Sequence, residues 1–251
     1  MTAWKRPEYT KLVLDALAKA WRRGWRFFGS LDEATKNPEV AEAMLSFARN
    51  HDGIVSVHTE NIGCDANTFE AVELAFRFGG SDFNLHLEDD TVPSPDALDL
   101  GGLFGGGAGG SGNAGGSAFL LLHSDSRGGE SPFALREIMR FNSWGWGVSR
   151  AHWELFRREW NTKKNHPRGW DWSMNLSVQR NALIGLQPFL SRVKNIGRNG
   201  GTYETPENHD AWTHGLVQAR AESTAEFEIV ERLAPGYAQA VEPWVLEAET
   251  K

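Results

Sequence analysis

Apolar residues in the first part of the chain follow two alternating patterns. Segments in which they recur every three or four residues predict helices over residues 7–22, 39–49 and 68–78. Short segments rich in β-branched, aromatic and other apolar residues between these helices predict strands over residues 25–30, 54–58 and 83–87. Because strands and helices alternate at this rhythm, the pattern predicts an α/β fold with a doubly wound, mostly parallel sheet.

The second part of the chain continues this pattern with more interruptions. Apolar runs predict strands over 119–122 and 189–196, and helical spacing predicts helices over 132–140, 149–160 and 172–181. Residues 101–117 are rich in glycine, which disfavours helix and strand, so a mobile surface loop or an artificial linker is expected there. The polar segment 198–206 is predicted to be a loop. No internal repeat is visible, so residues 1–251 are expected to form one domain with a flexible insert at 101–117.

Composition narrows the class of protein. The chain has 251 residues, of which 40% are hydrophobic and one is cysteine, so it can bury a sizeable core but cannot form an internal disulfide. A net charge of −7 disfavours a general nucleic-acid binder. No apolar run is long enough to cross a membrane, and the first residues lack the apolar stretch of a secretory signal. We therefore expect a soluble, cytoplasmic protein.

Three adjacent carboxylates, Glu88, Asp89 and Asp90, directly follow the strand predicted over 83–87. In a parallel α/β sheet, ligands bind beyond the carboxyl ends of the strands. Like charges placed there need a counter-charge, which Mn²⁺ or Mg²⁺ would supply, because these ions prefer oxygen ligands and need few protein ligands when a diphosphate completes the shell. A solvated acidic turn is the alternative. Residues 94–96 then predict a helix start, with serine as N-cap and proline at the first position.

A family resemblance runs through the chain. Residues 87–90, followed by Pro-Ser-Pro-Asp at 93–96, resemble the DxD region of GT-A glycosyltransferases, in particular N-acetylglucosaminyltransferase I and the protein O-mannose N-acetylglucosaminyltransferases. Further segments resemble that family in the same order along the chain: Ala-Trp-Lys-Arg at 3–6, Ser-Leu-Asp at 30–32, the Gly-Trp segment at 141–147, Trp-Asp-Trp-Ser-Met at 170–174, and Leu-Ser-Arg at 190–192 with Ile-Gly at 196–197. The resemblance implies a Rossmann-like GT-A sheet flanked by helices.

The resemblance also implies a reaction, namely metal-dependent, inverting transfer of a sugar, either N-acetylglucosamine or glucose, from a UDP-sugar donor. Asp90 matches the last acid of the family triplet and would ligate the metal, while Glu88 and Asp89 would face the ribose and sugar hydroxyls. Asp171 matches the family's catalytic base, which takes a proton from the acceptor hydroxyl. The residue-based alternative for Asp171 is a helix N-cap.

Other residues match the donor side of the family more loosely. Lys5 and Arg6 match a basic segment beside the nucleotide, with plain surface charge as the alternative. Asp32 matches the acid that contacts uracil, although it or Ser30 could instead cap the helix over 39–49. Arg192 would bind the diphosphate or pair with a core acid.

Histidine and tryptophan side chains complete the predicted site. His209 is a candidate second metal ligand, with a surface histidine as the alternative. Four side chains are candidates for the acceptor side: Trp146, Trp170, Trp172 and His123.

Two acceptors and two other protein classes stay open. The acceptor is either a glycan or protein hydroxyl or a hydroxymethylated base in phage-type DNA, because cations and aromatic residues alternate at 21–26 and 157–168. The missing stem and membrane anchor suggest a stand-alone bacterial or phage enzyme. A metal-dependent nucleotidyltransferase would need more basic residues around a triphosphate. A non-catalytic sugar-binding module would need neither the acidic triplet nor Asp171.

Overall fold

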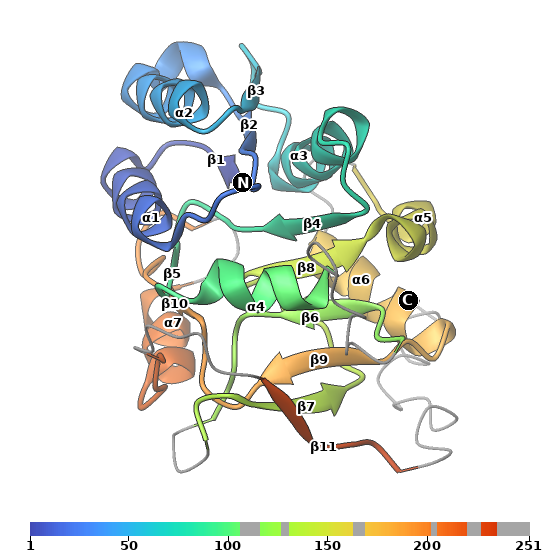
Figure 1. Cartoon of the computed structure of the whole chain (residues 1–251). Coiled ribbons are helices and arrows are strands. Elements are labelled where there is room, and N and C mark those ends of the chain that lie inside the picture. Colours follow the sequence, from blue (N-terminus) through green and yellow to red (C-terminus); the bar gives the residue numbers. More distant parts are fainter. Residues whose placement is uncertain (106–115, 127–130, 163–168, 202–204, 220–226, 235–251) are drawn as a thin grey trace.

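The computed structural model describes residues 1–105, 116–126, 131–162, 169–201, 205–219 and 227–234 (Figure 1). Its helices are α1 (Pro7–Ala20), α2 (Pro38–Asn50), α3 (Cys64–Phe78), α4 (Ala97–Phe104), α5 (Arg150–Glu159), α6 (Trp170–Arg180) and α7 (Pro206–Thr213), with a short 3₁₀ turn at Ala34–Lys36. Its strands are β1 (Thr2–Ala3), β2 (Phe28–Leu31), β3 (Ile54–Val57), β4 (Phe83–His86), β5 (Thr91–Pro93), β6 (Phe119–Leu121), β7 (Ala134–Ile138), β8 (Trp146–Ser149), β9 (Gly185–Pro188), β10 (Val193–Asn195) and β11 (Glu228–Glu231).

The strands form a central sheet whose two parts meet at β1. Strands β1, β2 and β3 pair in parallel, and a second group pairs in the order β11-β7-β9-β6-β8-β4. The amide of Thr2 donates to the carbonyl of Leu87 over 3.1 Å, and Thr2 bridges Glu88 in parallel, so β1 lies beside the end of β4. Strands β8, β7 and β11 run against the others, and β10 pairs separately with β5.

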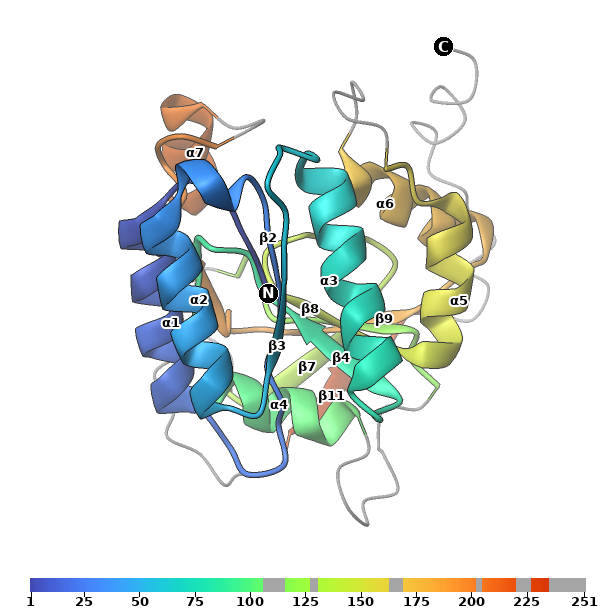
Figure 2. The same cartoon turned by 90° about the horizontal axis from the view of Figure 1, so that it is seen from above.

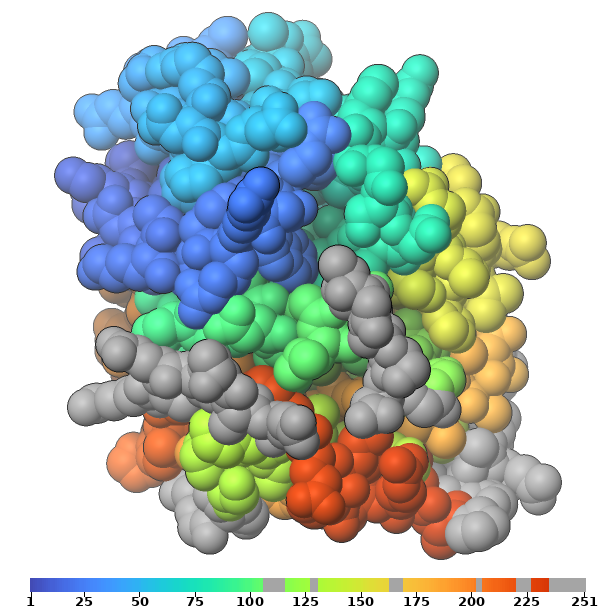
Figure 3. All heavy atoms as spheres, viewed as in Figure 1, coloured from blue at the N-terminus to red at the C-terminus, as the bar shows by residue number. Residues whose placement is uncertain are grey.

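Helices cover both faces of this sheet (Figure 2). Helices α1 and α2 bury Leu14, Leu17 and Met44 in one apolar cluster that also contains residues of α4. Helices α3, α5 and α6 cover the opposite face, where Trp153 and Trp170 join a second, aromatic cluster. In the space-filling view of the same side, the N-terminal third of the chain forms the upper part of the surface, α4 the middle and β11 the lower part (Figure 3). Within the described residues, no helix combines the length and the apolar character that a bilayer crossing requires.

The structure confirms most of the predicted helices and strands and corrects others. The segment predicted as a helix over 132–140 contains β7 (Ala134–Ile138) instead, because it pairs with β9 on one side and β11 on the other, and such pairing outweighs local spacing. Strands β5, β8, β9 and β11 and helix α7 were not predicted. Helix α4 extends into the glycine-rich segment, where Gly101 packs closely, because a Cβ atom there would lie 3.1 Å from the side chains of Leu85 and Trp25. The rest of the predicted insert, at 106–115, lies outside the described residues.

Candidate active site

A cavity of about 660 Å³ lies at the carboxyl edge of β1, β2 and β4; we call it the larger cavity. It brings together eight of the predicted site residues: Arg6, Asp32, Glu88, Asp89, Asp90, Trp170, Asp171 and Trp172. Asp90 and Asp171, the predicted metal ligand and the predicted base, are 81 positions apart in the sequence and line the same cavity. This is the edge at which doubly wound sheets bind ligands.

The acidic triplet forms a closed turn between β4 and β5. Thr91 fixes this turn, because its hydroxyl donates to the carbonyl of Glu88 over 3.0 Å and accepts from the amide of Glu88 over 2.9 Å. The side chains of Asp89 and Asp90 are only 5% and 12% exposed. The strand end therefore holds the three carboxylates in place against their mutual repulsion.

Arg6 is the counter-charge of this turn. Its Nη2 atom forms ion pairs with Asp89 Oδ1 and, over 2.9 Å, with Asp90 Oδ2. Its other terminal nitrogen, Nη1, is buried and donates no hydrogen bond to any described residue. Burial raises the pKa of Asp89 to about 6 even though Arg6 acts against the shift. Burial and repulsion from Asp90 and Asp89 likewise raise the pKa of Glu88 well above its ordinary value. One guanidinium does not neutralise three carboxylates.

Gly197 forms the wall behind Asp90. A Cβ atom at this position would lie 2.2 Å from Asp90 Oδ2, so only glycine permits the observed approach. The neighbouring amide of Ile196 donates to the carbonyl of Asp90 over 2.8 Å, and the amide of Gly197 donates to Asn195 Oδ1 over 2.7 Å. The segment after β10 therefore sets the position of Asp90.

Asp171 lies in the first turn of α6, on the other side of the larger cavity. Its Oδ1 atom accepts a hydrogen bond from the amide of Trp172 over 2.9 Å. Although its side chain is exposed to the cavity, the cavity walls desolvate it and raise its pKa, with a smaller contribution from the charge of Asp65. Asp171 is also close enough to Glu88 for its charge to raise the pKa of Glu88.

Asp32 lines the cavity at the end of β2 but does not cap α2, whose N-cap is Asn37. Its carboxylate accepts hydrogen bonds from the amides of Ile62 (2.7 Å) and Gly63 (3.1 Å) and from Asn61 Nδ2 (3.0 Å). It therefore fastens the loop before α3 to the carboxyl end of β2. A carboxylate has about four lone-pair sites, so Asp32 retains capacity for one further donor.

Five predicted site residues lie outside the larger cavity: Lys5, Trp146, His209, His123 and Arg192. Lys5 is exposed and places its ammonium 3.9 Å from the ring centre of Trp4, outside the set of residues that line the cavity. Trp146 is fully buried in the aromatic cluster, so it is a core residue. His209 is buried behind Asn195, whose Oδ1 lies 3.2 Å from His209 Nε2, so it does not reach the cavity. His123 lines a different cavity.

Arg192 is a structural residue. Its side chain is 0% exposed, its Nε donates to Asp96 Oδ2 over 3.0 Å, and Nη1 donates to the carbonyl of Leu190 over 2.7 Å. The predicted alternative, pairing with a core acid, is therefore confirmed. The predicted helix start is also corrected, because Asp96 rather than Ser94 occupies the N-cap of α4, and Ser94 Oγ donates to Asp96 over 2.7 Å.

Sequence reasoning missed several residues that line the larger cavity. Asp65 and Asn67 lie at the start of α3, Trp4 directly follows β1, and Asn195 and Trp212 belong to β10 and α7. Trp212 is 62% exposed, which is unusual for so large an apolar side chain. The unusual number of tryptophans was the one available signal; the other residues occur in segments without a recognisable motif.

The charge of the larger cavity is strongly negative. Its described lining contains six acidic residues and only one basic residue, Arg6. The acidic lining residues are Asp32, Asp65, Glu88, Asp89, Asp90 and Asp171. In the described parts of the chain, no three His, Cys, Asp or Glu side chains are arranged to hold a metal ion by themselves. A divalent cation would fit here, because Mn²⁺ and Mg²⁺ prefer oxygen ligands such as the carboxylate of Asp90. The oxygens of an anionic ligand would complete its coordination, and the cation would offset the repulsion between that ligand and the carboxylates.

Comparisons with known proteins bear on the fold. No protein-family model matches the sequence, and no curated protein is significantly similar to it. Two solved structures resemble it with a TM-score of 0.50: a mannosyltransferase from Pyrobaculum calidifontis in complex with GDP-Man and Mn²⁺ (13% identity, 79% of this chain) and residues 1–349 of TarS from S. aureus (14% identity, 76% of this chain). An inositol-1-phosphate CTP transferase from T. maritima is less similar, with a TM-score of 0.45.

These likenesses confirm the predicted fold class, an α/β, GT-A-like sheet flanked by helices. The chain spans 57% and 59% of the lengths of the first two structures. At this level of identity, the function has to be argued from the residues of the cavity.

Proposed function

We propose that this protein is a glycosyltransferase that uses a nucleoside diphosphate sugar, a UDP-sugar in the first instance, together with Mn²⁺ or Mg²⁺. The observation that carries the proposal is the closed acidic turn at 88–90, with Arg6 paired to Asp89 and Asp90, across the same cavity from Asp171. A carboxylate cluster and a separate carboxylate at the start of a helix match the two chemical tasks of sugar transfer. One task is to hold the departing diphosphate and the other is to accept the proton of the attacking hydroxyl.

Each residue has a role in this proposal. Asp90 would hold the cation, which when bound neutralises the charge that develops on the leaving diphosphate. Arg6 would donate from its guanidinium, which lines the cavity, to a donor phosphate. Asp32 would accept from the nucleobase, and Glu88 would accept from hydroxyl groups of the donor.

Asp171 would act as the base. An aspartate is ionised at neutral pH, and the raised pKa of Asp171 makes it a better proton acceptor than an exposed aspartate. Attack from its side of the sugar, opposite the diphosphate, would invert the anomeric centre. Trp170 and Trp172 would exclude water from this side of the cavity, so that the acceptor rather than water receives the sugar.

The acceptor we propose is a hydroxyl of an uncharged molecule or a protein, not DNA. The six acidic residues of the cavity repel a phosphate backbone. The predicted DNA-binding segment 21–26 precedes β2, at the opposite edge of the sheet from the cavity, and there Arg22 pairs with Asp99. In the second segment, Arg157 pairs with Glu73, and residues 163–168 lie outside the described residues.

The two other protein classes are disfavoured by the same cavity. A nucleotidyltransferase has to hold a triphosphate, and Arg6 is the one basic residue in the described lining. A sugar-binding module would not need the acidic turn.

A screen of UDP-sugars by thermal melting, with and without Mn²⁺, tests the proposal. The donor should protect the protein only when Mn²⁺ is present. Asp90→Ala should abolish this protection, whereas Asp171→Asn should keep it and lower transfer or donor hydrolysis at least about a hundredfold, the usual contribution of a general base. Asp82→Asn, at a 95% exposed side chain, is the control. Equal protection with and without Mn²⁺, or full turnover by Asp171→Asn, would contradict the proposal.

A further inference from the structure

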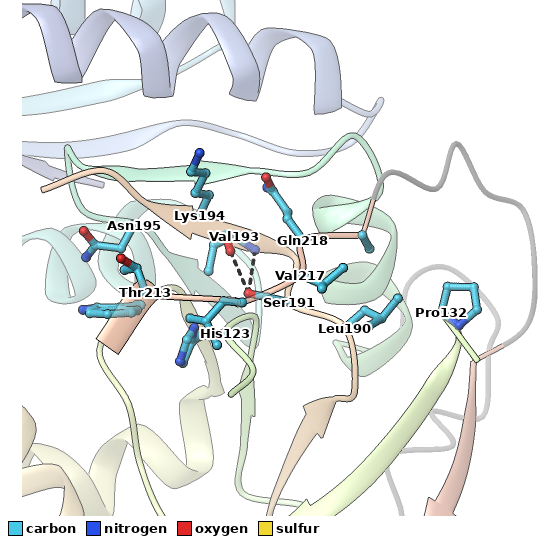
Figure 4. A pocket seen from close by; sticks show the side chains of 13 residues that line it. His123, Pro132, Leu190, Ser191, Val193, Lys194, Asn195, Thr213, Val217 and Gln218 are labelled. Carbon is cyan, nitrogen blue, oxygen red and sulfur yellow. Dashed lines mark hydrogen bonds between the residues drawn. The ribbon is translucent and has the colours of Figure 1, made fainter. Parts of the chain in front are cut away.

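A second cavity, of about 520 Å³, lies beside the larger one (Figure 4). It follows the ends of β6 and β9, through His123 and Ser191, and is bounded by β10 and by the chain after α7. The second cavity therefore lies at the same carboxyl edge of the sheet as the larger cavity. It lies beyond the ends of β6 and β9, whereas the larger cavity lies beyond the ends of β1, β2 and β4. Its size is within the range of small-molecule sites.

The two cavities share part of their lining. Trp144 and Asn195 border both of them. Asn195 Oδ1 accepts from the amide of Gly197, the residue packed against the carboxylate of Asp90. A molecule that reacts in the larger cavity could therefore extend past Trp144 into the second cavity.

The wall of the second cavity is mainly apolar. The side chains responsible are Trp144, Leu190, Val193, Leu216, Val217 and Ala219. Lys194 is the one formally charged residue in the described lining, and its ammonium is directed away from the other labelled side chains (Figure 4). Burial lowers the pKa of His123 to about 4, so its ring is neutral at pH 7. This cavity is therefore suited to an uncharged ligand.

Several of the polar groups in this wall are already bonded within the protein. Ser191 Oγ donates to the carbonyl of Val193 over 2.6 Å and accepts from the amide of the same residue (Figure 4). Gln218 Nε2 donates to the carbonyl of Val92 over 3.1 Å, and Thr213 Oγ1 donates to a carbonyl of α7 over 2.8 Å. A ligand would meet these groups largely satisfied and would gain mainly from burial of apolar surface.

We propose that the second cavity binds an uncharged aromatic or aliphatic group of the acceptor, next to the hydroxyl that receives the sugar. This inference rests on the proposed function, which places the nucleotide and the donor sugar in the larger cavity. In that proposal, the nucleobase, the diphosphate and the sugar of the donor contact Asp32, Arg6 and the acidic turn, all in the larger cavity. The second cavity, beyond Trp144, is therefore available to the acceptor.

Matched pairs of simple acceptors test this inference. Phenyl and methyl β-glycosides of glucose, mannose and N-acetylglucosamine differ only in the group that the cavity would hold. Binding to the full chain is measured by calorimetry, and transfer is measured with the UDP-sugar found in the screen. At least one phenyl glycoside should bind about tenfold tighter than its methyl partner, because burial of a ring of this size gives at least that factor.

Two substitutions of Val217 should each remove the preference for the phenyl glycoside, one by bulk and one by charge. Val217 is 39% exposed and lies in the chain after α7, so Val217→Trp fills the cavity and Val217→Glu adds a charge without much bulk. Val230→Trp and Val230→Glu, at a 56% exposed position on β11, are the matched controls. Both Val217 variants should lose the phenyl preference, whereas both Val230 variants and the affinity for UDP with Mn²⁺ should stay as in the wild type.

The outcomes separate this inference from the proposed function. If the wild type binds both glycosides equally, or if both Val217 variants keep the phenyl preference, the inference is wrong even when sugar transfer occurs. If no nucleotide sugar supports transfer while the phenyl preference remains sensitive to Val217, the proposed function fails, and with it the acceptor role of the second cavity.

Discussion

Replacement of Arg6 by methionine should change metal binding and nucleotide binding in opposite directions. The guanidinium forms ion pairs with Asp89 and Asp90, so its positive charge lies beside the carboxylates that a divalent ion would use. Its removal deletes the positive charge that pairs with Asp89 and Asp90 and should strengthen the binding of Mn²⁺ alone. The same change deletes the guanidinium that lines the cavity, the proposed donor to a phosphate, and should weaken the binding of UDP at saturating Mn²⁺.

General energies of charge interactions give the size of these effects. A single and a double positive charge about 5 Å apart repel by about 1.7 kcal/mol at the dielectric constant of water, which corresponds to more than tenfold in Mn²⁺ affinity. Loss of a hydrogen bond between two charged groups costs about 1.5–3 kcal/mol, so UDP affinity should fall about tenfold to a hundredfold. Stability without metal should fall by about 3 kcal/mol, the low end for breaking a buried ion pair, because Arg6 is 19% exposed.

Manganese binding can be followed by electron paramagnetic resonance of the free ion, UDP binding by calorimetry and stability by urea unfolding. Arg22→Met is the control, since Arg22 forms a bidentate pair with Asp99 (2.8 and 2.7 Å) away from the cavity. Arg22→Met should alter neither affinity. Unchanged or weaker Mn²⁺ binding by Arg6→Met would refute the competition between guanidinium and cation, and unchanged UDP binding would refute the phosphate contact.

Three further predictions concern other parts of the site and the core. Gly197→Ala should displace the carboxylate of Asp90, because the new Cβ would lie 2.2 Å from its Oδ2 atom, and should weaken Mn²⁺ binding at least about tenfold. Gly102→Ala is the control and should leave Mn²⁺ binding unchanged, because a Cβ atom there meets nothing within 4 Å. His123 protonates near pH 6.5 in the unfolded chain but near 4 in the folded protein, so folding stability falls as the pH drops through this window, and His123→Gln should reduce that fall in urea titrations at several pH values. Arg192→Met should cost about 3–5 kcal/mol in urea unfolding because its aspartate partner stays buried, whereas Arg198→Met, at a half-exposed pair, should cost less than about 1 kcal/mol.

The sequence was sufficient to predict the fold where local pattern and tertiary structure agree. Helix α1 has a proline at its start and an apolar stripe, and β4 alternates apolar and polar residues, so both were predicted close to their observed bounds. Strand β7 was predicted as a helix because its apolar residues also fit helical spacing, and only its partners β9 and β11 decide between the two. Pairing partners far along the chain are not visible in a local pattern.

The candidate site was predictable to the extent that its residues follow strand ends or belong to motifs. The acidic turn and Asp171 were both identified and share a cavity. Arg192 and Trp146 were misassigned because a sequence motif does not show on which side of a backbone a side chain lies; both are fully buried. Asp65 was missed since nothing in its neighbourhood distinguishes it from an ordinary helix start.

The ring of Trp170 belongs to two environments at once. One side lines the larger cavity, and the ring is stacked on Trp160 with centroids 4.9 Å apart and planes 11° apart. A ligand that changes the polarity next to Trp170 therefore acts on a stacked pair of indoles. The protein therefore contains an intrinsic fluorescence probe: a shift in tryptophan emission when a nucleotide is added, smaller in Trp170→Phe than in the wild type, would report occupancy of the cavity without any label.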